Sequence, residues 1–320
     1  MTFSKDQLIY TLREKIRDSL MPLITHDYVL LDLPYYNNIG DTLIWEGTRE
    51  FLKTLPYKCL YYASKDSFIY RELPSDTIIL LQGGGNFGSL YRQHSEFRKK
   101  IIKLYPNNKI IILPQSVYYE NDTYIKEDAE AYSNHSNLTI CAREQYSYNF
   151  LLAHFRNQCL LIPDMAFYID ISKFHLTENQ NKILYLKRID KEFVNENIEY
   201  SIPAEAERHD WPTYEQSFKT SACVEWWFYN VSRVCRIIGI GSRWIARLDD
   251  WKRNYYYRRF YVQLGIDFLC QYQTVYTTRL HVLILAVLLD KKIYLINNTS
   301  GKVVNFYTTW LKEFDNVKQL

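Results

Sequence analysis

An arginine and a histidine stand at the junction between a short strand and an apolar helix in the last quarter of the chain. Residues 275–281 read VYTTRLH, and the apolar run 282–289 follows at once. The first segment predicts a strand and the second a buried helix. Open α/β sheets bind ligands at the C-terminal ends of their strands, and helix N-termini attract anions. Arg279 and His281 are therefore candidates for anion binding and proton transfer.

Another cation follows this pair after a turn-rich segment. Residues 297–302 read NNTSGK and end in Lys302. Two cations and an ionisable imidazole that converge on one helix start suit a small, highly charged anion. The alternative is structural, because an Arg or His at a strand end also forms ordinary salt bridges.

Strand-like apolar runs alternate with helical patterns through the first half of the chain. The segments that follow these runs are polar or rich in glycine: NIGD (38–41), GGGNFG (83–88), PQS (114–116) and RE (143–144). Such alternation predicts a mostly parallel sheet that is covered on both faces. The C-terminal strand ends share one edge of such a sheet, so these segments are expected to line one cleft.

Each of these segments has a functional and a structural interpretation. The 83–88 segment follows a strand and precedes a helix, but it is neither a complete dinucleotide fingerprint nor a Walker A motif. It predicts a ligand cleft or a turn that needs close backbone approach. Asp41 is a catalytic candidate or the N-cap of the following helix. Arg143 is an anion ligand or a structural partner of Glu144 or Asp164.

The composition is that of a folded protein with little net charge. Of its 320 residues 47% are hydrophobic and 23% charged, and the net charge is +3. These values exclude a disordered chain and argue against a nucleic-acid partner. The six cysteines form no CxxC pair, so we expect reduced thiols and no metal site. Neither a secretory signal nor a membrane-spanning apolar run is evident, which predicts a cytoplasmic protein.

Residues 233–259 are unusually basic and aromatic. They hold eight cations against two acids, a net charge of +6, interleaved with Trp, Tyr and Phe. Basic residues with interfacial aromatics suit a helix that lies on an anionic membrane surface. A solvated helix with an aromatic core side gives the same pattern. Peripheral contact with the inner face of the cytoplasmic membrane is therefore one of two expectations for this segment.

Taken together, the motifs resemble the polysaccharide pyruvyl transferase family. The matching segments follow the family's order: NIGD (38–41), LLQGGGNFG (80–88), LPQS (113–116), CARE (141–144), PDMAF (163–167), HDW (209–211), TTRLH (277–281) and NNTSGK (297–302). Each segment is weak alone, but the ordered set is specific. One departure is Val282, which stands where the family usually has a small residue and could narrow the donor pocket.

The resemblance implies an α/β fold of two Rossmann-like domains facing a cleft, as in GT-B glycosyltransferases. The expected N-terminal domain, on the acceptor side, is 1–172, and it is completed by 303–320 as a C-terminal helix that packs back on it. The expected donor-side domain is 173–302.

The resemblance also implies a reaction without a cofactor. The pyruvyl group of phosphoenolpyruvate is transferred onto two hydroxyls of a sugar and forms a cyclic ketal. The acceptor we expect is a polyprenyl-diphosphate-linked oligosaccharide, an intermediate of a bacterial capsule or exopolysaccharide. The implied donor-binding residues are Arg143, Arg279, Leu280 (through its backbone), His281 and Lys302. The implied acceptor-binding residues are Asn38, Asp41, Gly84, Gly85, Asn86 and Gln115. His281 is the predicted general acid and Asp41 the predicted base.

Two other functions are compatible with the sequence. A GT-B glycosyltransferase would use a nucleotide sugar, although residues 173–302 offer no convincing acidic ligand for a ribose. A non-catalytic scaffold of polysaccharide assembly would need the basic and aromatic segment 233–259 but not the Arg279, His281 and Lys302 set.

Overall fold

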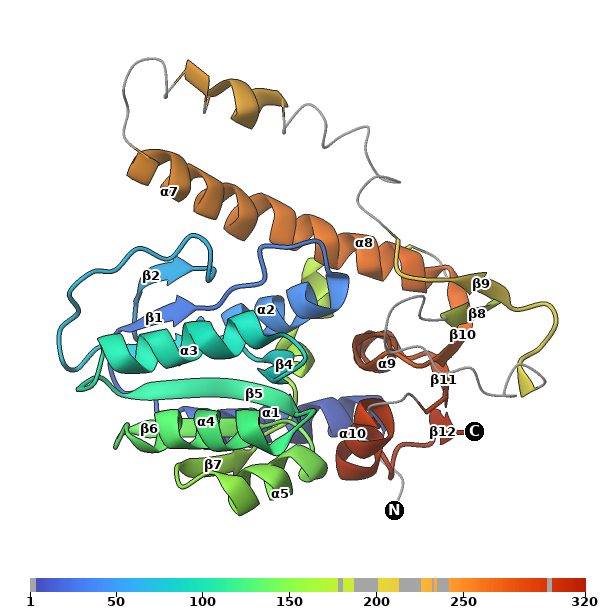
Figure 1. Ribbon diagram of the computed structural model, residues 1–320. Helices are drawn as coiled ribbons and strands as arrows, with labels where there is room; N and C mark the ends of the chain where they lie inside the picture. The colour runs from blue at the N-terminus through green and yellow to red at the C-terminus, as the bar shows by residue number, and fades with distance from the viewer. Residues whose placement is uncertain are drawn as a thin grey trace.

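The structure is a computed structural model with two parallel β-sheets and helices packed around them (Figure 1). It describes residues 4–177, 181–186, 201–212, 226–231, 233–234, 242–297 and 301–320. The mixed α/β class agrees with the prediction from sequence. The GT-B arrangement and its domain boundaries at 172 and 302 stay predictions.

The first sheet has seven parallel strands in the order β2-β1-β3-β5-β6-β7, and β4 pairs with β5. The strands are β1 (Tyr28–Leu31), β2 (Cys59–Ala63), β3 (Ile78–Leu81), β4 (Gly84–Gly88), β5 (Ile110–Tyr118), β6 (Leu138–Ala142) and β7 (Gln158–Leu161). In the strand order, β2 and β3 lie on opposite sides of β1, so the direction in which the chain adds strands reverses at β1. Such switch points leave a crevice in which ligands bind. Strand β4 replaces the loop that the glycine-rich sequence predicted.

Side chains of alternate residues fill the two faces of this sheet. Val29, Ile79 and Ile112 pack with buried residues of α3 (Arg92–Leu104), α4 (Asp122–Ser133) and α5 (Gln145–His154). Leu30, Leu80 and Ile111 belong to the other cluster, with α1 (Lys5–Leu20) and α2 (Ile39–Leu52). The sheet is therefore covered on both faces, as its continuous apolar strands predict.

The second sheet has five parallel strands in the order β12-β11-β10-β8-β9. They are β8 (Lys182–Leu186), β9 (Glu207–His209), β10 (Tyr272–Thr277), β11 (Lys292–Leu295) and β12 (Val317–Gln319). The helices around it are α7 (Ser242–Lys252), the π-helical η5 (Arg253–Tyr257), α8 (Arg258–Cys270), α9 (Leu280–Leu288) and α10 (Lys302–Trp310). Figure 1 shows α7 and α8 as one long rod across the top of the molecule.

The C-terminal residues 302–319 contact both sheets. Helix α10 packs towards the first sheet, because Phe306 stacks on Phe167 at 6.0 Å and Trp310 donates to the carbonyl of Arg143 at 2.8 Å. The predicted helical pattern over 303–320 is wrong beyond Trp310, where the chain turns and adds β12 to the second sheet. Pairing with the exposed edge of β11 outweighs local helical periodicity there.

Helix α2 lies between the two sheets and joins their cores. One continuous cluster of buried side chains includes residues of α2, α8 and α9. A Cβ built on Gly47 would lie 1.9 Å from the carbonyl oxygen of Met165, so only glycine lets α2 come this close to η1 (Met165–Tyr168). Asn38, rather than Asp41 as the sequence suggested, caps α2 by accepting from the Asp41 N–H at 3.2 Å.

Candidate active site

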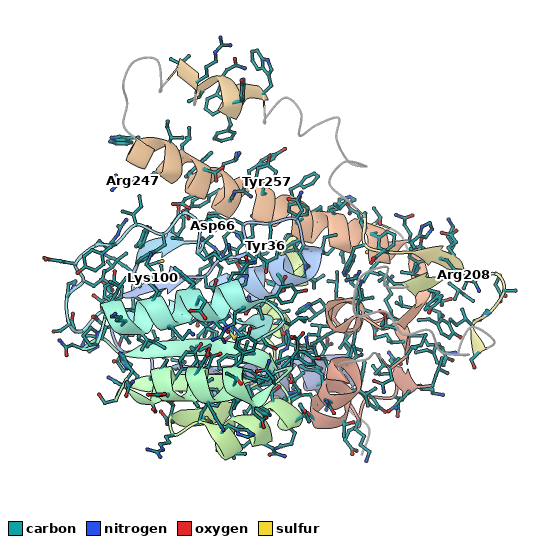
Figure 2. All side chains as sticks on the ribbon, in the orientation of Figure 1. Tyr36, Asp66, Lys100, Arg208, Arg247 and Tyr257 are labelled. Carbon is teal, nitrogen blue, oxygen red and sulfur yellow. The ribbon has the colours of Figure 1, made fainter. Side chains whose placement is uncertain are left out.

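A cavity of about 360 Å³ lies where the C-terminal strand edge of the first sheet meets elements of the second. This volume falls within the range of small-molecule sites. The lining residues come from both halves of the chain: Tyr36, Asn37, Asn38, Gly40, Asp41, Gly85, Asn86, Tyr91, Gln93, His94, Arg143, Trp211, Arg279, Leu280, His281 and Lys302. Of these lining residues, Figure 2 labels Tyr36.

Most of the residues predicted from sequence share this cavity. Asn38, Asp41, Gly85, Asn86 and Arg143 come from the first sheet's elements, and Arg279, Leu280, His281 and Lys302 come from the second's. Gly84 and Gln115 are not among the lining residues. Gln115 is fully buried, and its Nε2 donates to the carbonyl of Gln82 at 2.8 Å, which ties two strand ends together behind the cavity. In the predicted NNTSGK segment, residues 298–300 lie outside the described part of the chain.

Arg143 is buried and held at three points. Its Nε donates to Ser116 at 2.7 Å, its Nη1 donates to Asp164 at 2.8 Å, and its backbone N–H donates to the Gln115 carbonyl at 3.0 Å. The third guanidinium nitrogen, Nη2, lies 3.3 Å from a Cβ built on Gly85, and Lys302 Nζ lies 3.7 Å from the same point. The absence of a side chain at Gly85 therefore leaves room beside two converging cations.

Asp164 connects this arginine to His281. Its carboxylate caps η1 by accepting from the Ala166 N–H at 2.9 Å, and Oδ2 also lies 3.4 Å from His281 Nε2. Burial alone would raise the pKa of Asp164, but the hydrogen bond and charge of His281, together with Arg143, lower that pKa to about 2. Asp164 is thus ionised at neutral pH. The sequence placed it only as an alternative partner of Arg143.

The orientation of His281 follows from these neighbours. Its Nε2 lies 3.3 Å from Arg143 Nη1, and a guanidinium can only donate. Nη1 already donates to Asp164, so the ionised carboxylate favours a proton on Nε2 that points to the same oxygen. Nδ1 then faces Gly40, where a Cβ would lie 2.7 Å away. Gly40 is therefore the close packing partner that fixes the ring.

Arg279 and the start of α9 form an anion-binding corner. Arg279 Nη2 donates to Asp210 at 2.6 Å, and Arg279 is itself the N-cap residue of α9. The first backbone bond of α9 runs from Leu283 to the Arg279 carbonyl at 3.1 Å. The N–H groups of Leu280 and His281 thus have no partner within the helix, which makes this helix start suitable for phosphate or carboxylate.

Known proteins share this sequence pattern. The sequence profile of the family described as polysaccharide pyruvyl transferase matches residues 38–300. The chain belongs to the polysaccharide pyruvyl transferase family. It is 36% identical over 288 residues to the Bacillus subtilis protein named "Putative pyruvyl transferase EpsO", covering 89% of this chain and 86% of that protein.

A further relative agrees with this assignment, and a solved structure shares the fold. Pyruvyl transferase 1 of Schizosaccharomyces pombe is 26% identical over 296 residues, which cover 88% of this chain and 69% of that protein. A crystal structure of an uncharacterized Klebsiella pneumoniae protein superposes with a TM-score of 0.57 and 21% identity, over 100% of this chain and 99% of that one. That likeness shows the shared fold alone. Family membership makes the chain an enzyme, a polysaccharide pyruvyl transferase.

The cavity wall that comes from the first sheet's elements holds two polar groupings. The Tyr36 hydroxyl donates to Asp41 Oδ2 at 3.0 Å, and the residue as a whole is 41% exposed. Desolvation of the hydroxyl end, followed by the Asp41 charge, raises the pKa of Tyr36, so the phenol stays protonated. The second grouping is His94 with Asp32 and Arg98, which sequence reasoning missed. His94 sits inside a helical pattern, and nothing in its local sequence separates it from a core histidine.

The described residues hold neither a cluster of metal ligands nor a membrane-spanning helix. Within those ranges, no three His, Cys, Asp or Glu side chains gather as a metal site would require. Among the same residues, no helix has the length and apolarity that crossing a bilayer demands.

Replacing Asp164 by Asn should destabilise the pyruvyl transferase by about 3–5 kcal/mol at pH 7, because Arg143 would stay buried without its anion. The native pKa of about 2 lies below the unfolded value of about 3.9, so the carboxylate's contribution is complete above pH ~4 and is lost as pH falls towards 2. Urea denaturation should therefore show the gap between wild type and Asp164→Asn narrowing by about 2 kcal/mol between pH 4 and 2. The exposed Asp18→Asn is the control; a gap independent of pH would contradict the assignment.

Proposed function

We propose that this pyruvyl transferase moves the pyruvyl group of phosphoenolpyruvate onto two hydroxyls of a sugar, as a cyclic ketal. The observation that supports this most is the convergence of Arg143 Nη2 and Lys302 Nζ beside Gly85, in the same cavity as Arg279 and the start of α9. Phosphoenolpyruvate carries a carboxylate and a phosphate on a three-carbon frame, and two cationic subsites in one small cavity match these groups.

The proposed chemistry needs a proton at one carbon and two attacking hydroxyls. The imidazolium of His281 donates a proton to C3 of the enol, and the oxocarbenium-like C2 is attacked by the first sugar hydroxyl. Phosphate leaves, the second hydroxyl adds to C2, and the ring closes. One hydroxyl proton replaces the proton given to C3, and the other leaves with phosphate. Asp164 suits the acid role of His281, because an ionised carboxylate stabilises the imidazolium.

The proposed acceptor is a lipid-diphosphate-linked oligosaccharide, reached by docking at the membrane surface. The surface that supports this, here called the aromatic platform, consists of half-exposed or exposed rings: Trp226, Trp227, Tyr229, Trp244, Trp251 and Tyr255. Phe228 contacts both Trp227 and Trp251, and Trp251 contacts Tyr255, so these four rings form a connected group. Trp226 and Tyr229 flank it in sequence, and Trp244 lies on α7 with Trp251. From the aromatic platform the α7–α8 rod runs to Gly265, whose added Cβ would lie 3.8 Å from Trp211 in the cavity wall.

The charged residues of 233–259 contribute less to the proposed membrane docking than the sequence suggests. Arg258 is buried against Glu46, and Lys252 and Arg253 both pair with Asp249. Arg236 and the side chain of Arg243 lie outside the described part of the structure. Exposed cations remain at Arg233, Arg247 (labelled in Figure 2) and Arg259. Membrane docking is therefore proposed to depend chiefly on the rings, with the cations adding preference for anionic lipid.

Phosphoenolpyruvate should raise the melting temperature of the wild-type protein. At a concentration roughly one hundred times its Kd, it adds about 2.7 kcal/mol to the free energy of unfolding. Arg279→Ala should lose this shift, because it removes the guanidinium beside α9. UDP and GDP serve as controls in the same thermal titration. A shift with a nucleotide and none with phosphoenolpyruvate would favour the glycosyltransferase instead, and a family-like transfer activity that survives Arg279→Ala would contradict the site.

His281→Gln should keep phosphoenolpyruvate binding and lower turnover by roughly 10²–10⁴, the usual contribution of a general acid. The thermal titration reports binding, and phosphate release in the presence of acceptor reports turnover. Turnover near that of wild type would show that His281 only binds the donor.

Liposome flotation should show the wild-type protein on vesicles of neutral lipid and more of it on vesicles with anionic lipid. The double variant Trp226→Ala and Trp244→Ala should stay unbound, because it removes two of the most exposed rings. Leu152→Ala, an exposed apolar residue on α5, is the matched control. Flotation of the double variant at the wild-type level would exclude the aromatic platform as the docking surface.

A further inference from the structure

A second pair of histidine and carboxylate faces the cavity from the first sheet. His94 Nδ1 lies 2.7 Å from Asp32 Oδ1, and the two side chains are 5% and 0% exposed. His94 lines the same cavity as His281 but comes from α3. The cavity therefore holds two imidazoles, each oriented by a buried carboxylate, on elements of different sheets.

The backbone of Asp32 is in a conformation that L-residues rarely adopt. Its φ is 63°, directly after β1, and such a conformation costs on the order of 1–2 kcal/mol for a residue with a side chain. Arg98 holds the second carboxylate oxygen at 3.1 Å, and Arg98 also bonds the side-chain oxygen of Asn86. Strained residues that the surroundings fix in this way concentrate at functional sites. Here the strain aims a carboxylate at one ring nitrogen of His94.

This geometry selects one tautomer of His94. A carboxylate paired with Arg98 accepts the Nδ1 proton, so Nε2 of the neutral ring carries a lone pair. Within the described residues, Nε2 has no hydrogen-bond partner. The groups that surround the ring are Asp32, Arg98, the Tyr36 ring at 6.3 Å and, through the Tyr36 hydroxyl, Asp41. An oriented imidazole with a lone pair open to a substrate cavity is the arrangement of a general base.

We propose that His94 is the base that takes the proton from the attacking sugar hydroxyl, with Asp32 as its positioning residue. This inference rests on the pyruvyl transfer proposed above. The acceptor O–H bond breaks as the new C–O bond to C2 forms, and the proton moves to His94 Nε2. His281 gives its proton to C3 from the other wall. His94 then passes its proton to the leaving phosphate or to solvent before the second hydroxyl reacts.

The base assigned from sequence, Asp41, has a different role in this scheme. Its carboxylate accepts from the protonated phenol of Tyr36, and Oδ1 lies 3.8 Å from a Cβ built on Gly84. Asp41 and Tyr36 together present hydroxyl-binding groups, and they position the sugar against His94. The cations Arg143, Arg279 and Lys302 line the cavity with His281 and bind the donor.

The test uses His94→Gln and Asp32→Asn in the full-length protein. Asn tolerates the left-handed backbone of Asp32 but leaves the fully buried Arg98 without its anion, so thermal melting first establishes that this variant is folded at the assay temperature. His94→Gln keeps the pair of Asp32 and Arg98 and carries the test if Asp32→Asn does not fold. Activity is phosphate release from phosphoenolpyruvate with a panel of p-nitrophenyl hexosides that offer free 1,2- and 1,3-diols. Both variants should bind phosphoenolpyruvate as wild type does, and kcat at saturating acceptor should fall by roughly 10²–10⁴. His26→Gln, at an exposed histidine that does not line the cavity, is the matched control.

The split between kcat and KM separates a base from a residue that only binds the acceptor. Loss of the base lowers kcat at saturating acceptor, whereas loss of a binding contact raises the acceptor KM. A raised acceptor KM with kcat unchanged would overturn the proposal and leave pyruvyl transfer standing. Phosphoenolpyruvate binding without phosphate release by wild type on the whole panel would count against pyruvyl transfer to simple sugars and remove this inference with it.

Discussion

The site depends on the buried carboxylate of Asp164. One oxygen accepts from Arg143 of the first sheet and lies against His281, in the first turn of the helix after β10 of the second. A buried charge without partners is costly, so the buried Arg143 and Asp164 depend on each other, with the partly exposed His281 beside them. The carboxylate is in turn placed by η1, which packs against the backbone of α2 at Gly47. A missing Cβ in one helix thus decides where the Asp164 carboxylate lies and how the His281 imidazole is turned.

Helix α2 makes this arrangement possible because it packs against elements of both sheets. Its N-terminus carries Asn38 and Asp41 into the cavity, while further along Glu46 forms a buried ion pair with Arg258 of α8. Burial, with Arg259 next, lowers the pKa of Arg258 to about 10, so the guanidinium stays charged at neutral pH and needs its partner. The same α8 continues α7 towards the aromatic platform. One helix pair therefore links the cavity wall to the surface that we propose for the membrane.

The sequence predicted the parts of the site that depend on residues close together in the chain. Strand ends followed by Arg143, by Gly85 or by TTRLH could be recognised, because parallel strands bring such ends to one edge. Contacts between distant parts of the chain could not be predicted in this way. The glycine-rich run became β4 because β5 offered an edge, and Gln115 turned away from the cavity to bond Gln82. Asp32 and His94 are 62 residues apart, and their pairing depends on a strained backbone angle that no sequence pattern encodes.

The proton inventory of the proposed ketal formation would account for two imidazoles in one cavity. In that reaction a proton must reach C3 of the donor while another leaves an oxygen that approaches C2. An imidazole whose Nε2 lies against Asp164 has only one other nitrogen, so it could not serve both positions at once. In the proposed scheme, acid and base on different walls each keep their own carboxylate and their own tautomer. The strain at Asp32 would then maintain the second imidazole as the proton acceptor, in a cavity whose first imidazole donates.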